Sequence, residues 1–139
     1  MGWSPAGRSL ALRSMWGADR SAIAPTNLYV ALYSGDPQGA GVEPTATGGY
    51  ARPAALNDST LWGTISPGAT SITTIADITW PTSSGVWSIT TPLTHWAILD
   101  NTAGGTIICS GQLTTPITIT GAGDTARIPA GSLTIMQEA

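Results

Sequence analysis

Alternating side chains over residues 27–33 form the most regular pattern in the chain. Tyr29 and Tyr33 fall on one face of an extended segment, and the opposite face is aliphatic. Because successive side chains of a β-strand point to opposite faces, this alternation predicts a strand. We expect both of its faces to be covered, one by the domain's own core and the other by a second sheet or subunit.

Further short, strand-like segments recur along the chain, and Gly, Pro, Asn or Asp residues separate them. Strands spaced by roughly 8–12 residues predict a mainly β fold, a single antiparallel β-sandwich of the jelly-roll or immunoglobulin-like kind. The clearest hairpin joins 94–100 to 106–113 through the turn "NTAGG". The other strands predicted after residue 50 are 51–56, 60–65, 70–80, 86–90, 116–120, 125–128 and 132–137.

One short N-terminal α-helix is predicted over residues 4–17. Ser4 suits the cap, Pro5 suits the first helical position, and Gly17 suits the end. Apolar side chains near its end share one face and include Trp16. A helix of this length is marginal alone, so we expect it to dock and to bury Trp16.

The length of 139 residues, without an evident repeat or linker, fits a single domain. In this interpretation residues 1–26 contain the N-terminal helix and the segment that leads into the first strand, and residues 27–139 form the sandwich. Only 9% of the residues are charged, and Lys is absent. A weakly charged surface rich in Thr tends to associate, so we expect a homo-oligomer, for example a trimer, or a larger assembly.

Several partner classes are disfavoured by composition. The net charge of −3 and the lack of a basic cluster argue against nucleic acid, whose phosphates require Lys or Arg. No apolar run approaches the roughly 18 residues that a membrane-spanning helix requires. We therefore expect neither nucleic acid nor a membrane as a partner.

The glycine-rich stretch "SGDPQGAGVEPTATGGYARPA" over 34–54 raises the question of a phosphate-binding loop. Such a loop needs a following helix and usually a Lys, and the sequence offers neither. We interpret the stretch as a connection, with a turn at 35–37 and positive φ at Gly48 and Gly49. It is expected to rejoin the sheet at 50–52 and to be a natural place for contact with a neighbour.

Candidate catalytic residues are few. His95 is the only histidine, it lies in a predicted strand, and no Gly-x-Ser-x-Gly motif accompanies it, so a structural role is favoured. Cys109 lies in an apolar run and is interpreted as a buried, inert thiol. The acidic residues are scattered, which gives no metal loop. We expect no catalytic residue, no metal and no cofactor.

Tryptophan is unusually frequent for a chain without Phe. The four central residues could form a sugar-stacking platform, or they could supply the volume of the core and of subunit interfaces. The second interpretation is favoured, because a β domain without Phe needs large apolar side chains. These residues are Trp62, Trp80, Trp87 and Trp96.

Taken in order, several stretches resemble a family of small virion proteins of tailed bacteriophages, described as tail-fibre-like or head-decoration proteins. The resemblance implies a structural part of the virion, made in the host cytoplasm, with no known catalytic residues. The stretches are "TNLYVALYSGDP", "GVEPTATGGYARPA", "ADITWPTSSGVWSITTPLTHWAILD", "GGTIICSGQLTTP" and "GDTARIPAGSLTI".

Within this resemblance we expect a non-enzymatic capsid decoration (cement) protein that binds major capsid subunits. The compact size and the absence of a fibrous repeat favour this role. The alternative is a tail-fibre or baseplate module that binds tail proteins and contacts the host surface, and a free carbohydrate-binding or hydrolytic domain is the third hypothesis. Candidate interface residues are Arg8, Arg13, Trp16, Arg20, Tyr29, Tyr33, Tyr50 and Arg52.

Overall fold

The computed structural model describes residues 15–16, 27–65 and 68–136, which form two compact units. Each unit is built from segments that alternate along the chain. Unit 2 consists of 28–55 and 78–127, and the described part of unit 1 consists of 15–16, 27, 56–65, 68–77 and 128–136. The single-domain organisation stays a prediction.

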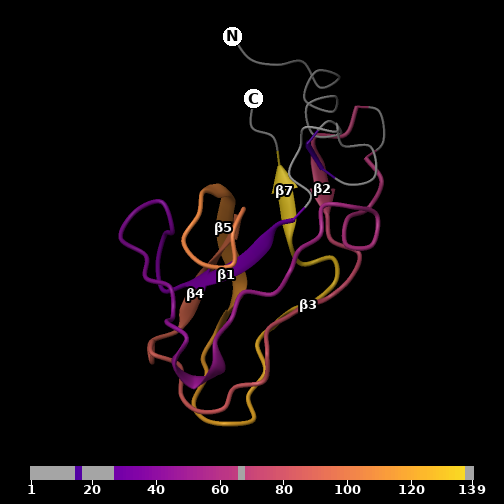
Figure 1. Cartoon of the computed structure of the whole chain (residues 1–139). Coiled ribbons are helices and arrows are strands. Elements are labelled where there is room, and N and C mark those ends of the chain that lie inside the picture. Colours follow the sequence, from indigo (N-terminus) through magenta and orange to yellow (C-terminus); the bar gives the residue numbers. More distant parts are fainter. Residues whose placement is uncertain (1–14, 17–26, 66–67, 137–139) are drawn as a thin grey trace. The chain divides into compact units, whose positions relative to one another are not determined.

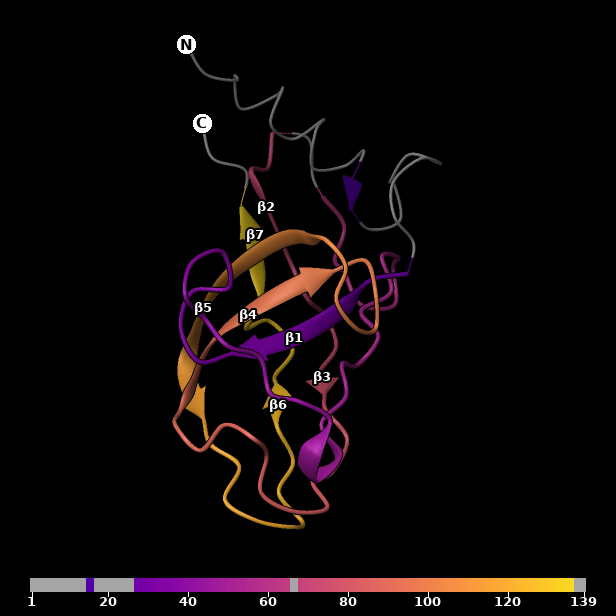
Figure 2. The same ribbon diagram turned by 60° about the vertical axis from the view of Figure 1, so that its left-hand side comes forward.

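Unit 2 is centred on a three-stranded antiparallel sheet of β1 (Tyr29–Tyr33), β4 (Leu93–Leu99) and β5 (Ile107–Ile117). The strands lie side by side in the order β1-β4-β5 (Figures 1 and 2). The alternating segment and the hairpin predicted from the sequence are therefore confirmed. Both faces of β1 are covered, because its four residues from Val30 to Tyr33 are buried.

The register of this sheet explains a glycine in the middle of a strand. Trp96 of β4 lies opposite Gly111 of β5. A Cβ atom at Gly111 would lie 2.7 Å from the ring of Trp96, so a larger residue would displace the indole. On the other face, Ala97 and Leu99 pack with residues of β1 into a buried apolar cluster, against which Ile107 rests.

Unit 1 contains a small antiparallel pair, β2 (Ser71–Thr73) and β7 (Thr134–Met136), which run side by side in Figures 1 and 2. Its opposed isoleucines, Ile72 and Ile135, are buried. A third sheet pairs β3 (Ile78–Thr79) with β6 (Arg127–Ile128). The fold is thus mainly β with antiparallel sheets, whereas the sandwich stays a prediction.

Several predicted strands are shorter than expected. The segments 51–56 and 60–65 contribute only isolated bridges, through Ala54 and Trp62. The prediction over 70–80 corresponds to β2 and β3, the start of 116–120 belongs to β5, and 125–128 and 132–137 shorten to β6 and β7.

The strand predicted over 86–90 is wrong, since this segment is irregular. Its apolar pattern instead reflects a single buried anchor, Trp87, whose ring packs edge-on against Tyr50 with the centroids 5.0 Å apart. The hydroxyl of Ser88 accepts a hydrogen bond from the Thr45 amide. A side chain, and not the backbone of a paired strand, therefore satisfies this N–H group.

The central tryptophans are core residues, as predicted. Trp62, Trp80 and Trp87 are each 1% exposed, and Trp96 is 7% exposed, so none of these four rings offers an open face to a sugar. Trp16 is also buried at 5%, and its ring lies 5.3 Å from that of Trp62. The predicted helix over 4–17 lies outside the described residues, apart from Met15 and Trp16.

Candidate functional site

The glycine-rich connection over 34–54 closes the edge of β1 that does not pair with β4. Every second N–H of an edge strand points away from its sheet and needs a partner. Here each one has a partner from the connection. Val30 donates to the Pro53 carbonyl (3.1 Å), Leu32 to the Tyr50 hydroxyl (3.2 Å) and Ser34 to the Val42 carbonyl (3.0 Å).

This arrangement corrects the expectation that a strand resumes at 50–52. Tyr50 meets β1 through its side-chain hydroxyl, and backbone pairing begins only with the Pro53 carbonyl. The positive φ values predicted for Gly48 and Gly49 are confirmed, at 73° and 83°. A Cβ atom at Gly48 would lie 2.5 Å from the Val86 carbonyl oxygen, so the close approach of these two segments requires glycine.

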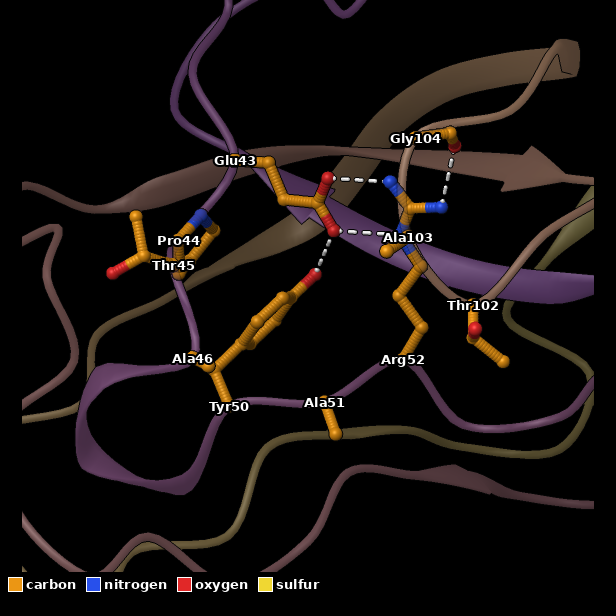
Figure 3. A pocket seen from close by; sticks show the side chains of 10 residues that line it. All are labelled: Glu43, Pro44, Thr45, Ala46, Tyr50, Ala51, Arg52, Thr102, Ala103 and Gly104. Carbon is orange, nitrogen blue, oxygen red and sulfur yellow. Dashed lines mark hydrogen bonds and ion pairs between the residues drawn. The ribbon is translucent and has the colours of Figure 1, made fainter.

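A carboxylate stands at the centre of the connection. Arg52 binds Glu43 through two parallel bonds, from Nε to Oε1 (2.7 Å) and from Nη2 to Oε2 (2.6 Å). The Tyr50 hydroxyl donates to Oε1 at 2.8 Å, and the Tyr33 hydroxyl donates to Oε2 at 3.5 Å. Figure 3 shows the carboxylate between the arginine and the tyrosine. We call these four residues the Glu43–Arg52 clamp.

The clamp also holds the turn between β4 and β5. Nη1 of Arg52 donates to the carbonyl oxygens of Asn101 (2.7 Å) and Gly104 (2.8 Å). The arginine side chain is only 4% exposed, and that of Glu43 is 19% exposed. A buried guanidinium thus fixes two loops that are about fifty residues apart in the sequence, and a fork of donors suits this task better than an ammonium would.

Ionisation within the clamp is shifted by its own contacts. The hydrogen bond to Glu43 raises the pKa of Arg52, although burial acts in the opposite direction. Burial, followed by the negative charge of Glu43, raises the pKa of Tyr50 and that of Tyr33. Both tyrosines therefore stay protonated at neutral pH and can donate to the carboxylate.

Beside the clamp lies a surface hollow of about 370 Å³, lined by residues 43–46, 50–52 and 102–104 (Figure 3). Its walls combine the ion pair with small apolar side chains, such as Pro44 and Ala103. The hollow belongs entirely to unit 2. It is a candidate binding site, since it brings convergent polar groups together with apolar surface.

The structure places three predicted interface residues, Tyr33, Tyr50 and Arg52, inside the clamp. Tyr29 is half-buried in β1. Arg8, Arg13 and Arg20 lie outside the described residues. Contact of the eight residues with another subunit stays a prediction.

Sequence reasoning missed Glu43, which organises the clamp. One available signal was its spacing from Arg52: two opposite charges lie nine residues apart, across a Gly-Gly turn, in a chain with few charges.

His95 and Cys109 do not form a reactive pair. Nδ1 of His95 lies 2.8 Å from the Thr94 hydroxyl, which itself accepts a hydrogen bond from the Gly35 amide. Cys109 is half-buried, and burial raises the pKa of its thiol to about 12, so the nucleophilic thiolate is scarce at neutral pH. Within 15–16, 27–65 and 68–136, no three His, Cys, Asp or Glu side chains come together to hold a metal.

The part of the chain that the structure describes also has no helix long and apolar enough to cross a membrane. A mainly β fold hosts many functions, so the fold alone does not define the class of protein. A family model described as "Podophage GP4 fiber I protein gp80" matches residues 15–136, and the chain belongs to this family. The expected resemblance to tailed-phage virion proteins is thereby confirmed. No curated protein matches the chain.

Proposed function

We propose that the protein is a structural module of the tail fibre or the adjoining baseplate of a tailed phage. The family match carries this proposal, because the family is one of fibre proteins and the match extends over residues 15–136. It favours the tail module over capsid decoration, the role expected first from the sequence. The protein would act by binding other virion proteins, without catalysing a reaction.

The contacts within unit 2 support a structural role. The closed edge of β1 and the buried Glu43–Arg52 pair hold the glycine-rich connection against the sheet. A connection fixed in this way can present a defined surface to a neighbour, because little conformational entropy remains to be lost on contact. We extend the proposal to a homo-oligomer, and we propose separately that the sheets of each chain form a single antiparallel β-sandwich.

Under this proposal the eight candidate interface residues fall into two groups, one with an indirect role and one with direct contacts. Trp16, Tyr33, Tyr50 and Arg52 would act indirectly, by holding the surface in shape, since their side chains are buried. Half-buried Tyr29, together with Arg8, Arg13 and Arg20, would supply direct contacts to neighbouring subunits.

Imaging of purified phage particles with an antibody against this protein tests the proposal. We expect labelling confined to the tail, with a small number of copies in each particle by quantitative mass spectrometry. An antibody against the major capsid protein serves as the control for head labelling. Labelling spread over the head, with hundreds of copies in each particle, would establish the decoration role and refute the tail module.

A further inference from the structure

We propose that the hollow beside the Glu43–Arg52 clamp binds a neutral sugar residue. This inference rests on the proposed function, because a module of the tail fibre is presented to the carbohydrates of a cell surface. The chemical argument itself depends only on the atoms that line the hollow.

The clamp retains one hydrogen-bond donor for a ligand. A guanidinium carries five N–H groups. In Arg52, Nε donates to Glu43, Nη1 donates to two carbonyl oxygens, and Nη2 uses one N–H for Glu43. The second N–H of Nη2 has no partner among the described residues. A side chain that is 4% exposed and lines the hollow therefore holds an unused donor.

An acceptor lies next to this donor. Oε2 of Glu43 receives one strong bond, from Arg52 at 2.6 Å, while the bond from the Tyr33 hydroxyl is long at 3.5 Å. A carboxylate oxygen has two lone-pair sites, and a ligand hydroxyl can replace Tyr33 at the second site, because that bond is long. The unused N–H of Arg52 Nη2 thus lies beside the acceptor Oε2 of Glu43. This pair suits hydroxyl groups, which both donate and accept hydrogen bonds.

The charge of the site favours a neutral ligand. The carboxylate and the guanidinium cancel, so the hollow offers neither a cation nor an anion a net attraction. Phosphate would be repelled by Glu43, and an ammonium group would be repelled by Arg52. Neutral sugars avoid both penalties.

The walls suit the ring of a sugar. Pro44, Ala46, Ala51 and Ala103 also line the hollow and supply small apolar groups, against which the C–H face of a pyranose can pack. A volume of about 370 Å³ falls at the lower end of the range for small-molecule sites, roughly 300–1,000 Å³. Figure 3 shows Ala103 beside the guanidinium of Arg52.

A peptide is a weaker candidate for this hollow. Extended peptides commonly bind by adding a strand to an open sheet edge. The edge of β1 nearest the clamp is already closed, since the connection accepts its N–H groups at residues 30, 32 and 34. A peptide would find none of these three N–H groups free.

The test uses the full chain and a panel of neutral monosaccharides: glucose, galactose, mannose, rhamnose and N-acetylglucosamine. Saturation-transfer NMR identifies a bound sugar, and titration calorimetry gives its dissociation constant, which we expect to be about 1 mM. Ala103→Trp fills the hollow without altering any clamp residue. Ala122→Trp, at an exposed alanine in another turn of unit 2, is the matched control.

We expect Ala103→Trp to weaken binding at least about tenfold and Ala122→Trp to leave it unchanged, with both variants as folded as wild type by circular dichroism. Two results would overturn the inference: no binding of any sugar in the panel, or equal binding by both variants. Neither result bears on the fibre role, which is tested by the location of the protein in the phage particle. Sugar binding by a protein located on the head would instead refute the fibre role.

Discussion

Replacing Arg52 with Met should destabilise the protein more than any other arginine substitution within the described residues. The change keeps much of the aliphatic stem but removes the guanidinium from a side chain that is 4% exposed. Glu43 then loses its counter-charge and two hydrogen bonds, and two carbonyl oxygens lose their donor. Both of those carbonyls belong to exposed residues and can turn to water.

The size of the effect follows from burial. Removing one partner of a fully buried ion pair costs about 3–5 kcal/mol. Glu43 is 19% exposed and keeps the Tyr50 hydroxyl, so the lower end, about 3 kcal/mol, applies here. For a chain of 139 residues this corresponds to a fall in the melting temperature of roughly 10 °C.

Urea denaturation, followed by tryptophan fluorescence and by circular dichroism, measures the free energy of unfolding. Arg127→Met is the matched control, because Arg127 is exposed, and it should change stability by less than about 1 kcal/mol. In a double-mutant cycle with Glu43→Met, the two losses should overlap by about 1–3 kcal/mol. If Arg52→Met unfolds like wild type, or if the two losses simply add, the clamp does not stabilise the fold as we describe.

Three further substitutions or treatments probe the same unit. Tyr50→Phe leaves the buried Leu32 amide without its acceptor, so it should cost about 1–3 kcal/mol and speed hydrogen exchange at that amide; an unchanged exchange rate would contradict the bond. Gly48→Ala should destabilise more than Gly123→Ala in thermal melts, since both glycines have positive φ but only the first Cβ meets a carbonyl oxygen; equal losses would refute a steric cause. Burial raises the pKa of Cys109 from 9.0 to about 12, so iodoacetamide should modify the native thiol far more slowly than the urea-unfolded one. In this window, from pH 9 to 12, the unfolded chain binds fewer protons at this thiol than the folded protein, so the contribution of the thiol to stability falls as pH rises; fast native labelling at pH 8 would contradict the raised pKa.

The sequence predicted those parts of the fold whose signal is local. Residues 27–33 alternate at the period of a strand, and the hairpin around "NTAGG" combines two apolar runs with a glycine turn, so neither needs knowledge of distant contacts. The strand predicted over 86–90 was wrong because Trp87 is buried against Tyr50, which lies 37 positions earlier in the sequence. Apolar composition alone cannot distinguish a single buried side chain from a strand.

The candidate site was harder to predict for the same reason. Tyr50 and Arg52 were identified as contact residues, but their partner Glu43 and the Asn101 and Gly104 carbonyls were not. A backbone carbonyl has no residue-specific signature, and its selection depends on where the turn between β4 and β5 comes to lie.

The alternation of segments between the two units has a consequence for the synthesis of the protein. Residues 28–55 cannot complete unit 2 until 78–127 have left the ribosome, and unit 1 requires 128–136 as well. Contacts such as Gly35 to Thr94 must close long loops before they yield any stabilisation, which slows folding. Neither unit can therefore be completed before most of the chain has been synthesised, and until then its weakly charged β segments are exposed to neighbouring chains.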